Sequence, residues 1–472
     1  MTLRLHDTLS GETRPLVPLR DDRVGVYSCG PTVYGPAHIG NFRSFLFADL
    51  LVRHLRWRGY PVTWVMNITD IDDKIIRGAS ATGETIDALA ERYLAMFLAD
   101  AATLRMTVPD VLPRATRHID QIVALITTLL EREHAYRTDD GSVFFRIASW
   151  PAYGRLARLD PDGLRVGERV EADDYGKDDV RDFALWKGPK AGEPTWQTAI
   201  GPGRPGWHIE CSAMSMTHLG PSFDIHTGGV DLIFPHHEDE IAQSEAATGQ
   251  TFVGAWLHCA HLQTSGSKMA KSTGNIAQVG DVIAAGVSAR ALRLALISVH
   301  YRAGLNHSPE SLAAAGAALD RIDAAVAALG AYVQEGPDHP ALPEVLDTAR
   351  VDFGAALDDD LNVSAGLAVV FDLVRDLNRR IDARSMSTAD AGLALDTLRD
   401  LDRVLAILPD VEPAADVDPL VEALLEARVA ARAARDFSAS DRLRDQLAAI
   451  GVTVEDSRDG QRWRRTTEIG HG

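Results

Sequence analysis

The sequence lacks any long hydrophobic run and has few cysteines. No stretch approaches the roughly 18 consecutive apolar residues that a membrane-spanning helix needs. The first twenty residues carry five charged side chains instead of a hydrophobic signal core. Only three cysteines occur among 472 residues, Cys29, Cys211 and Cys259, which are too few for a disulfide framework. These absences predict a cytoplasmic protein with no membrane partner, whose reduced thiols can bind a metal or pack in the core.

A broad basic surface is also missing, because the formal net charge is −19. This argues against indiscriminate binding to nucleic acid. A local basic stripe does occur near the C-terminus, at Arg428, Arg432, Arg435, Arg442, Arg444, Arg462, Arg464 and Arg465, with Trp463 among the last three. The stripe is typical either of a narrow nucleic-acid contact with base stacking on Trp463, or of a solvated helix face followed by a tail.

Strand, loop, helix and strand follow one another in the first seventy residues. Residues 24–29 and 62–68 are short and rich in β-branched and aromatic residues, which predicts strands. Between them, residues 42–57 repeat apolar side chains at helical intervals and are followed by Gly59, which predicts a helix and its end. This βαβ unit indicates an α/β protein with a parallel sheet, whose ligands bind at the carboxyl ends of the strands.

The rest of the chain changes character several times. From about residue 310 a long 3.6-residue periodicity predicts a helical bundle, and the three prolines of residues 408–419 mark a linker. The other expected elements are a helix near 85–105, an insertion over 108–200 with a strand at 142–147, a return of the sheet domain near 205, terminal helices near 417–434 and 438–449, and a strand at 452–454.

The stretch CGPTVYGPAHIGNFRS, residues 29–44, places His38, Gly40 and Asn41 where a loop turns into the predicted helix. Backbone N–H groups and the dipole at a helix start favour phosphate. Gly40 lets a ligand approach the backbone closely, and His38 and Asn41 can donate hydrogen bonds to phosphoryl oxygens. Because the motif is short, its position at a strand-to-helix turn is what indicates a phosphate site.

A second stretch, SGSKMAKSTGN at residues 265–275, sets Lys268 and Lys271 three positions apart among glycines and serines. Such a loop suits a mobile clamp that closes on a polyphosphate. The alternative is a flexible surface loop with solvated lysines.

A third stretch, IFPHHEDEIAQSEA, sets two histidines beside a run of acidic residues. Positions four apart share a helix face, so His236 and Glu240 can point at a common spot while His237 points elsewhere. The acidic residues would also suit a helix N-terminus because of its dipole.

Two cysteines can complete a metal site with these residues. Cys29 ends the first predicted strand and Cys211 lies in the returning segment, so both can project above the same sheet edge. Two thiolates, one imidazole and one carboxylate are a plausible zinc set. The first ligand lies 182 residues before the second, which favours a functional site over a compact structural zinc motif.

With these residues in place, the chain resembles the cysteinyl-tRNA synthetases, a family of class I aminoacyl-tRNA synthetases, over essentially its whole length. The matching stretches are YSCGPTVYGPAHIGN, NITDIDDKII, GRPGWHIECSAM, DIHTGGVDLIFPHHEDEIAQSEA, KMAKSTGN and the FSASDRLRDQL…GQRWR pattern. Two signatures depart from the usual class forms, because HIGN replaces HIGH and KMAKS replaces KMSKS. Asn41 must then act where a histidine usually does, while both lysines are kept.

The resemblance implies ATP-dependent ligation of L-cysteine to the 3′ end of tRNA(Cys) through a cysteinyl-adenylate, by a monomer. It implies one zinc ion on Cys29, Cys211, His236 and Glu240 that binds the substrate sulfur, and ATP with Mg²⁺ as co-substrate. The implied ATP contacts are His38, Gly40, Asn41, Asp231, Lys268 and Lys271, of which His38, Asn41 and the two lysines are catalytic. The implied substrate contacts are Cys29, Thr69, Trp207 and His226.

The resemblance also implies an order of domains. A Rossmann-like parallel-sheet catalytic domain with an insertion is followed by an α-helical bundle and a small mixed C-terminal unit. The expected divisions are 1–115 and 201–255 for the two catalytic halves, 116–200 for the insertion, 256–312 for a stem-contact region with the KMAKS loop, 313–412 for the bundle and 413–472 for an anticodon-binding unit.

Two other functions remain compatible with the sequence. A ligase of the same fold could transfer activated cysteine to a small amine, although the complete C-terminal third speaks for tRNA. The other function is that of a catalytically silent RNA-binding regulator with a structural zinc. The HIGN motif and both clamp lysines argue against it.

Overall fold

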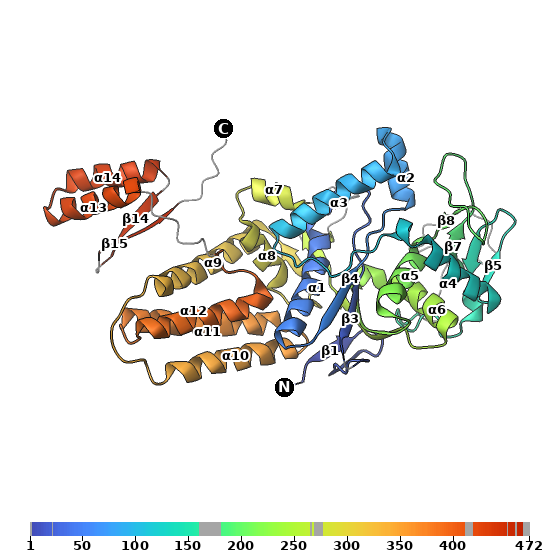
Figure 1. Cartoon of the computed structure of the whole chain (residues 1–472), viewed down its shortest axis with the longest axis horizontal. Coiled ribbons are helices and arrows are strands. Elements are labelled where there is room, and N and C mark those ends of the chain that lie inside the picture. Colours follow the sequence, from blue (N-terminus) through green and yellow to red (C-terminus); the bar gives the residue numbers. More distant parts are fainter. Residues whose placement is uncertain are drawn as a thin grey trace. The chain divides into compact units, whose positions relative to one another are not determined.

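The computed structural model describes residues 2–20, 22–159, 181–264, 267–268, 277–410, 419–450, 452–457 and 460–465. The chain divides into two compact units, residues 1–408 and 409–472 (Figure 1). The first contains a parallel sheet, an inserted antiparallel sheet and a helical bundle. Across the described ranges, no helix is long and apolar enough to span a membrane.

A four-stranded parallel sheet forms the centre of the first unit, in the order β10-β9-β3-β4. Its strands are β3 Val24–Ser28, β4 Val62–Met66, β9 Phe223–Gly229 and β10 Val253–Cys259. Both central strands, β3 and β9, are buried along their whole length, as expected where helices cover both faces of a parallel sheet. The predicted α/β class and its βαβ unit are confirmed.

Helix α1, Ile39–Trp57, connects β3 to β4 and begins before the predicted start at residue 42. The reason is a capping box that apolar periodicity does not reveal. His38 Nδ1 accepts the N–H of Asn41 at 3.2 Å, and Asn41 Oδ1 accepts the N–H of His38 at 3.1 Å. Gly59, with φ +86°, provides the predicted stop.

Helices α2, Asp73–Thr82, and α3, Ile86–Thr103, follow β4. The second matches the helix predicted near 85–105. Periodicity does not predict α2, because only Ile75 and Ala79 of its ten residues are buried. Its start is fixed by Asp72, whose side chain accepts the N–H of Lys74 at 2.7 Å.

The insertion is an antiparallel sheet, β5-β6-β7-β8, packed on α4, Ile119–Glu131. Its strands are β5 Ala135–Arg137, β6 Val143–Phe145, β7 Phe183–Lys187 and β8 Arg204–Pro205. The core of this sheet continues into α5, Trp207–Leu219, and α6, Glu238–Thr248. Residues 204–205, where the sheet domain was expected to return, therefore still belong to the insertion, because β8 pairs with β7.

Smaller elements surround the sheet. They are the hairpin β1 Arg4–Asp7 and β2 Glu12–Pro15, strands β11 Leu262–Thr264, β12 Ser267–Lys268 and β13 Leu305–His307, helices α7 Val279–Ala284 and α8 Ala289–Ile297, the 3-10 turns η1 Ala115–Arg117, η2 Ile147–Ser149 and η3 Val230–Leu232, and the π turn η4 Ile233–His237.

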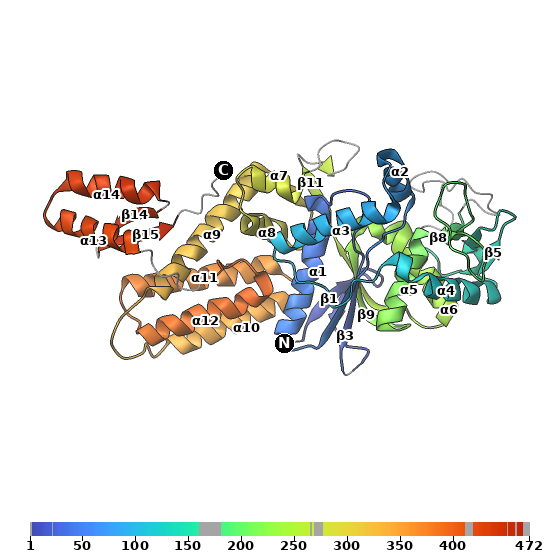
Figure 2. The same cartoon turned by 45° about the horizontal axis from the view of Figure 1, so that its top comes forward.

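The predicted helical bundle is present and packs beside α1 (Figure 2). It consists of α9 Pro309–Gly330, α10 Leu342–Asp358, α11 Val363–Asp382 and α12 Thr388–Leu405. The indole of Trp57 at the end of α1 donates to Asp400 of α12 at 3.2 Å and packs edge-on against Phe353 of α10. The bundle and the pocket-bearing helix α1 thus share one core.

The second unit contains α13 Pro419–Ala433, α14 Phe437–Ala449 and a hairpin of β14 Val452–Ser457 and β15 Gly460–Arg465. One member of the predicted basic stripe does not belong to a solvated face. Arg428 is 1% exposed and donates to Gln461 at 2.9 Å, because the hairpin covers that side of α13. Arg432, Arg435, Arg442 and Arg444 are exposed. The side chain of Trp463 lies outside the described part.

Candidate active site

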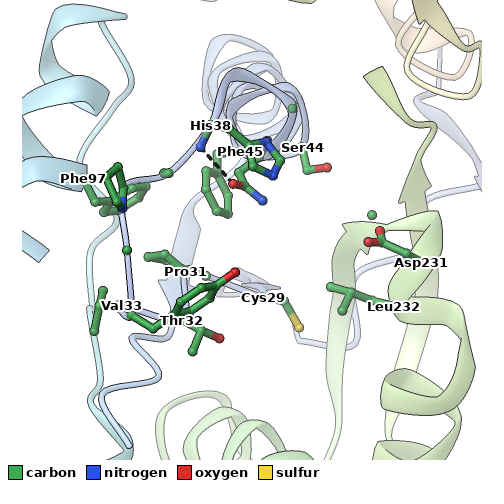
Figure 3. A pocket seen from close by; sticks show the side chains of 18 of the residues that line it. Cys29, Pro31, Thr32, Val33, His38, Ser44, Phe45, Phe97, Asp231 and Leu232 are labelled. Carbon is green, nitrogen blue, oxygen red and sulfur yellow. Dashed lines mark hydrogen bonds between the residues drawn. The ribbon is translucent and has the colours of Figure 1, made fainter. Parts of the chain in front are cut away.

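A cavity of about 290 Å³ opens at the carboxyl edge of the sheet, beside the start of α1 and the segments that follow β9 and β10 (Figure 3). Its lining includes six residues expected to act in the site: Cys29, His38, Gly40, Asn41, Trp207 and Asp231. Two other expected contacts, Thr69 and His226, are buried and do not line it. Thr69 accepts a hydrogen bond from the Asn67 amide at 3.1 Å, and His226 contacts Glu240.

The first turn of α1 presents its side chains to the cavity. Because His38 Nδ1 accepts the Asn41 N–H, the neutral ring carries its proton on Nε2, and because Asn41 Oδ1 is an acceptor, its Nδ2 group is a donor. The backbone N–H of Ile39 already donates to Ala277 at 2.9 Å. The backbone N–H groups of Ile39 and Asn41 thus have partners within the protein, so the start of α1 does not present the expected run of free backbone N–H groups.

The opposite sides of the cavity differ in chemistry. Figure 3 shows Asp231 and Leu232 on one side and Phe97 and Val33 on the other. Asp231 is more than half exposed, and its Oδ1 lies 4.0 Å from Nδ1 of His261. Asp231 thus offers a carboxylate to a ligand on one side, whereas the side chains of Phe97 and Val33 on the other are apolar.

Below this cavity, the four expected metal ligands converge. One donor atom each from Cys29, Cys211, His236 and Glu240 lies within 4.8 Å of the other three. Nε2 of His236 lies 3.0 Å from Oε1 of Glu240. Cys29 directly follows strand β3, and helix α5, the π turn and α6 supply the other three side chains, so segments far apart in the sequence meet at one sheet edge.

A second donor set overlaps the first. Cys29 and Glu240 also lie within 4.8 Å of His226 and His237. His237 was expected to point elsewhere, yet its Nε2 lies 3.3 Å from Sγ of Cys29. The expectation was wrong because residues 233–237 form a π turn in which Phe234 has a non-helical φ of −138°, so regular helix spacing does not apply. Pro235 inside the assumed helix was the available signal.

Burial and mutual contact shift the pKa values of this cluster. A hydrogen bond with Cys29 lowers the pKa of the Cys211 thiol to about 6, while burial raises the pKa of Cys29. Burial alone would raise the pKa of Glu240, but His226 and His236 lower it to about 2. Burial alone would lower the pKa of His236, but Cys211 and Glu240 raise it to about 10. At neutral pH the cluster holds a thiolate, a carboxylate and an imidazolium, whose proton a divalent cation can replace.

Outer residues hold the cluster in position. Nδ1 of His236 lies 2.9 Å from Nδ1 of His208, and Nε2 of His208 lies 3.4 Å from the carboxylate of Asp239. The indole of Trp207 stacks on His236 with ring centroids 4.3 Å apart. Contacts of this kind fix the orientation of metal-binding imidazoles.

The three acidic residues that follow the histidines have separate contacts. Glu238 accepts the backbone N–H groups of Gly154 at 2.7 Å and Ala157 at 2.9 Å, and Asp239 accepts the hydroxyl of Tyr153 at 2.5 Å. Only Glu240 enters the donor cluster. All three also occupy the first turn of α6, where the helix dipole favours them. The metal-ligand interpretation and the helix-dipole interpretation therefore each describe part of this segment.

The structure describes the two lysines of the SGSKMAKSTGN stretch only in part. The backbone of Lys268 belongs to β12, which pairs with β11, but its side chain is not described. Lys271 lies outside the described residues.

Comparison with known proteins identifies the class. The family model "tRNA synthetases class I (C) catalytic domain" matches residues 15–317. The fold is also that of a Mycobacterium tuberculosis methionyl-tRNA synthetase (TM-score 0.58, 17% identity, 82% of this chain and 90% of that chain) and of an Agrobacterium radiobacter leucyl-tRNA synthetase (TM-score 0.59, 12% identity, 83% and 84%). The sheet, the capped helix start and this match define a class I aminoacyl-tRNA synthetase.

Matches along the whole length narrow the class to one family. The models "DALR domain" and "Cysteinyl-tRNA ligase anticodon binding domain" match residues 352–409 and 414–464. Cysteine–tRNA ligases of Solibacter usitatus, Symbiobacterium thermophilum and Alkalilimnicola ehrlichii are 44%, 45% and 46% identical to the chain, each over 98% of it and 100% of the relative. The chain belongs to the cysteine–tRNA ligase family.

Proposed function

We propose that this chain ligates L-cysteine to the 3′ end of tRNA(Cys) with ATP, through a cysteinyl-adenylate, as a monomer in the cytoplasm. Full-length similarity to cysteine–tRNA ligases supports the reaction. The observation that carries the proposal is the double position of Cys29, which lines the cavity and belongs to the buried donor cluster. A substrate in the cavity can therefore bring its side chain to the cluster.

Cys29, Cys211, His236 and Glu240 are proposed to hold one zinc ion. Two thiols, an imidazole and a carboxylate suit zinc, and two of these donors, Cys211 and Glu240, have pKa values low enough to be deprotonated at neutral pH. When bound, zinc would supply a Lewis acid that prefers sulfur to a hydroxyl. Pocket shape alone separates near-isosteres by only about 1–3 kcal/mol, so this preference accounts for rejection of serine without a separate editing site.

The set that includes His226 and His237 is the alternative ligand set. Cys211 favours the first set, because its lowered pKa makes it a thiolate, whereas the only thiol of the second set is Cys29, whose pKa is raised. His226 and His237 then orient their neighbours: Nε2 of His226 lies 3.1 Å from Glu240, and Nδ1 of His237 lies 2.8 Å from Nε2 of His258.

For adenylate formation, the cysteine carboxylate attacks the α-phosphate of ATP and pyrophosphate leaves. His38 Nε2–H and Asn41 Nδ2 donate to phosphoryl oxygens, which the missing side chain of Gly40 leaves accessible, and Lys268 and Lys271 neutralise the leaving group together with Mg²⁺. Asp231 is proposed to contact the ribose side of ATP. In such a reaction the protein accelerates the transfer mainly by positioning the substrates and stabilising charge, and it contributes little covalent chemistry.

In the second step a ribose hydroxyl of the terminal tRNA adenosine, the 2′-OH by family resemblance, attacks the carbonyl carbon of the adenylate, so that an ester forms, the acyl–phosphate bond breaks and AMP leaves. Trp207 is proposed to cover the amino acid, since it lines the cavity and stacks on His236. Thr69 and His226 act from behind the lining, by fixing Asn67 and Glu240.

Cysteine-dependent ATP–pyrophosphate exchange followed by charging of total tRNA tests the proposal. Exchange with charging is expected. Exchange without charging would identify the amine-directed ligase instead, and the absence of both would identify a silent RNA-binding protein. Against the amine-directed reading stands the anticodon-domain match at residues 414–464.

A further inference from the structure

One wall of the cavity has no role in the proposed reaction so far. It contains Tyr34, Lys74 and Tyr93, which all line the cavity. Tyr93 precedes Phe97 by one turn of α3, so both point the same way, and Phe97 lies on the side away from Asp231 (Figure 3). The ammonium of Lys74 lies 5.5 Å from the ring centroid of Tyr34. Two half-buried aromatic rings and an exposed cation thus line the cavity, and the ring of Tyr93 lies on the side away from the proposed ribose contact.

The turn that bears Lys74 is anchored to the insertion. Its neighbour Asp73 accepts a hydrogen bond from Lys187 at 2.8 Å and another from Arg204. Both cations are buried, and Glu193 balances Arg204 at 2.9 Å. Removing one partner of such a partly buried ion pair destabilises the protein, because the other charge stays buried without a partner. The ion pairs therefore fix the first turn of α2 at the cavity rim.

The ring of Tyr93 is supported as well. The guanidinium of Arg92 lies 4.5 Å from its centroid and pairs with Glu84 at 2.6 Å. Further along the same wall, Phe97 stacks on Phe42 of α1 with centroids 5.8 Å apart. The aromatic wall therefore continues to the helix start that carries His38.

The choice of lysine at position 74 is informative in this chain. Only six of its 48 lysine and arginine residues are lysines, and three of the six are Lys74, Lys268 and Lys271. An ammonium is a compact point charge suited to a phosphate oxygen, whereas arginine supplies most other cations of the protein.

We propose that Tyr34, Lys74 and Tyr93 receive the unpaired 3′ nucleotides of the tRNA, an inference that rests on the proposed ligase function. The aromatic faces stack on bases, and the Lys74 ammonium binds a phosphodiester oxygen. Aromatic side chains beside a cation are the usual platform for single-stranded nucleic acid, and each stacked base contributes about 1–3 kcal/mol. ATP is the less suitable occupant, because its proposed contacts lie at the start of α1 and on the Asp231 side.

The variants Lys74→Met and Tyr93→Leu test the wall, with cysteine-dependent exchange and tRNA charging measured on each. Exchange is expected to stay within about twofold of the unaltered protein, while kcat/KM for tRNA falls roughly tenfold. Lys74→Arg should restore most of the loss. Arg77→Met, which removes an exposed cation one turn further along α2, is the matched control and should leave both reactions unchanged.

Salt dependence separates a phosphate contact from a structural effect. Loss of one single-strand phosphate contact should reduce the slope of log KM for tRNA against log salt by about 0.7 in Lys74→Met. An unchanged slope, an equal loss in Arg77→Met or an equal fall in exchange would each overturn the inference. If the unaltered chain neither exchanges nor charges, the proposed function itself fails, which is a distinct result.

Discussion

At one end of the pocket, Cys211, His236 and Glu240 are buried and contact one another, whereas at the other end His38 and Asn41 are partly or fully exposed and cap each other. The donor atoms of the buried end lie within 4.8 Å of one another, and neighbouring histidines contact them. The exposed end presents His38 and Asn41, to which the proposed function adds Lys268 and Lys271. Recognition of sulfur and handling of phosphate are thus expected to fail independently.

The largest expected effect is at the buried end. Cys211→Ser removes a thiolate from a buried cluster, so bound zinc should be lost and kcat/KM for cysteine in exchange should fall on the order of 10²–10³-fold. Zinc content by elemental analysis and exchange kinetics measure both. Cys259→Ser, a buried thiol outside either donor set, is the control.

The same assay distinguishes the two ligand sets. His237→Gln should keep stoichiometric zinc if Cys211 and His236 are the ligands. Retention of zinc in Cys211→Ser with loss in His237→Gln would assign the ion to the second set.

At the exposed end, Lys271→Ala should lower the rate of adenylate formation about 10²-fold, because one stabilising charge is removed from the leaving pyrophosphate. The affinity for cysteine should change little. Pre-steady-state adenylate formation and equilibrium cysteine binding give the two quantities, with Lys190→Ala as a control lysine outside the cavity lining. Equal losses in both would contradict the independence of the two ends.

Removal of the second unit extends the comparison beyond the pocket. A chain without residues 413–472 should charge tRNA roughly tenfold or more slowly while exchange remains near the original rate, because residues 1–408 form a compact unit. Equal collapse of both activities would show that the terminal unit serves folding instead.

The smallest expected effect is a pH dependence at the buried end. The folded-state pKa of Glu240, lowered to about 2, is below its unfolded value, so its stabilisation is present above about pH 4.5 and is lost as the pH falls toward 2. At pH 3.5 the metal-free protein should have lost about 1 kcal/mol by this route. Urea midpoints at pH 7 and 3.5 should show a smaller acid-induced drop in Glu240→Gln, and equal drops would count against the shift.

Much of the central sheet was predictable, because β3, α1 and β4 bury enough apolar side chains to leave a clear period. The convergence of the four proposed zinc ligands was predictable from residue type, since cysteines are rare and the histidines adjoin acids. The contacts of the His237 and Arg428 side chains were not predictable, because the π turn orients His237 and the terminal hairpin covers Arg428. Lys74 escaped notice because a single lysine in NITDIDDKII carries no signal until α2 brings it to the cavity.

The backbone hydrogen bonds from Gly154 and Ala157 to Glu238, two positions before Glu240, tie residues 154–157 to the helix that carries the proposed metal ligand Glu240. Substitutions that break these hydrogen bonds should therefore weaken metal binding, although residues 154–157 do not line the cavity. Variants near residues 153–157 that bind ATP normally yet need added zinc to work would be the expected phenotype.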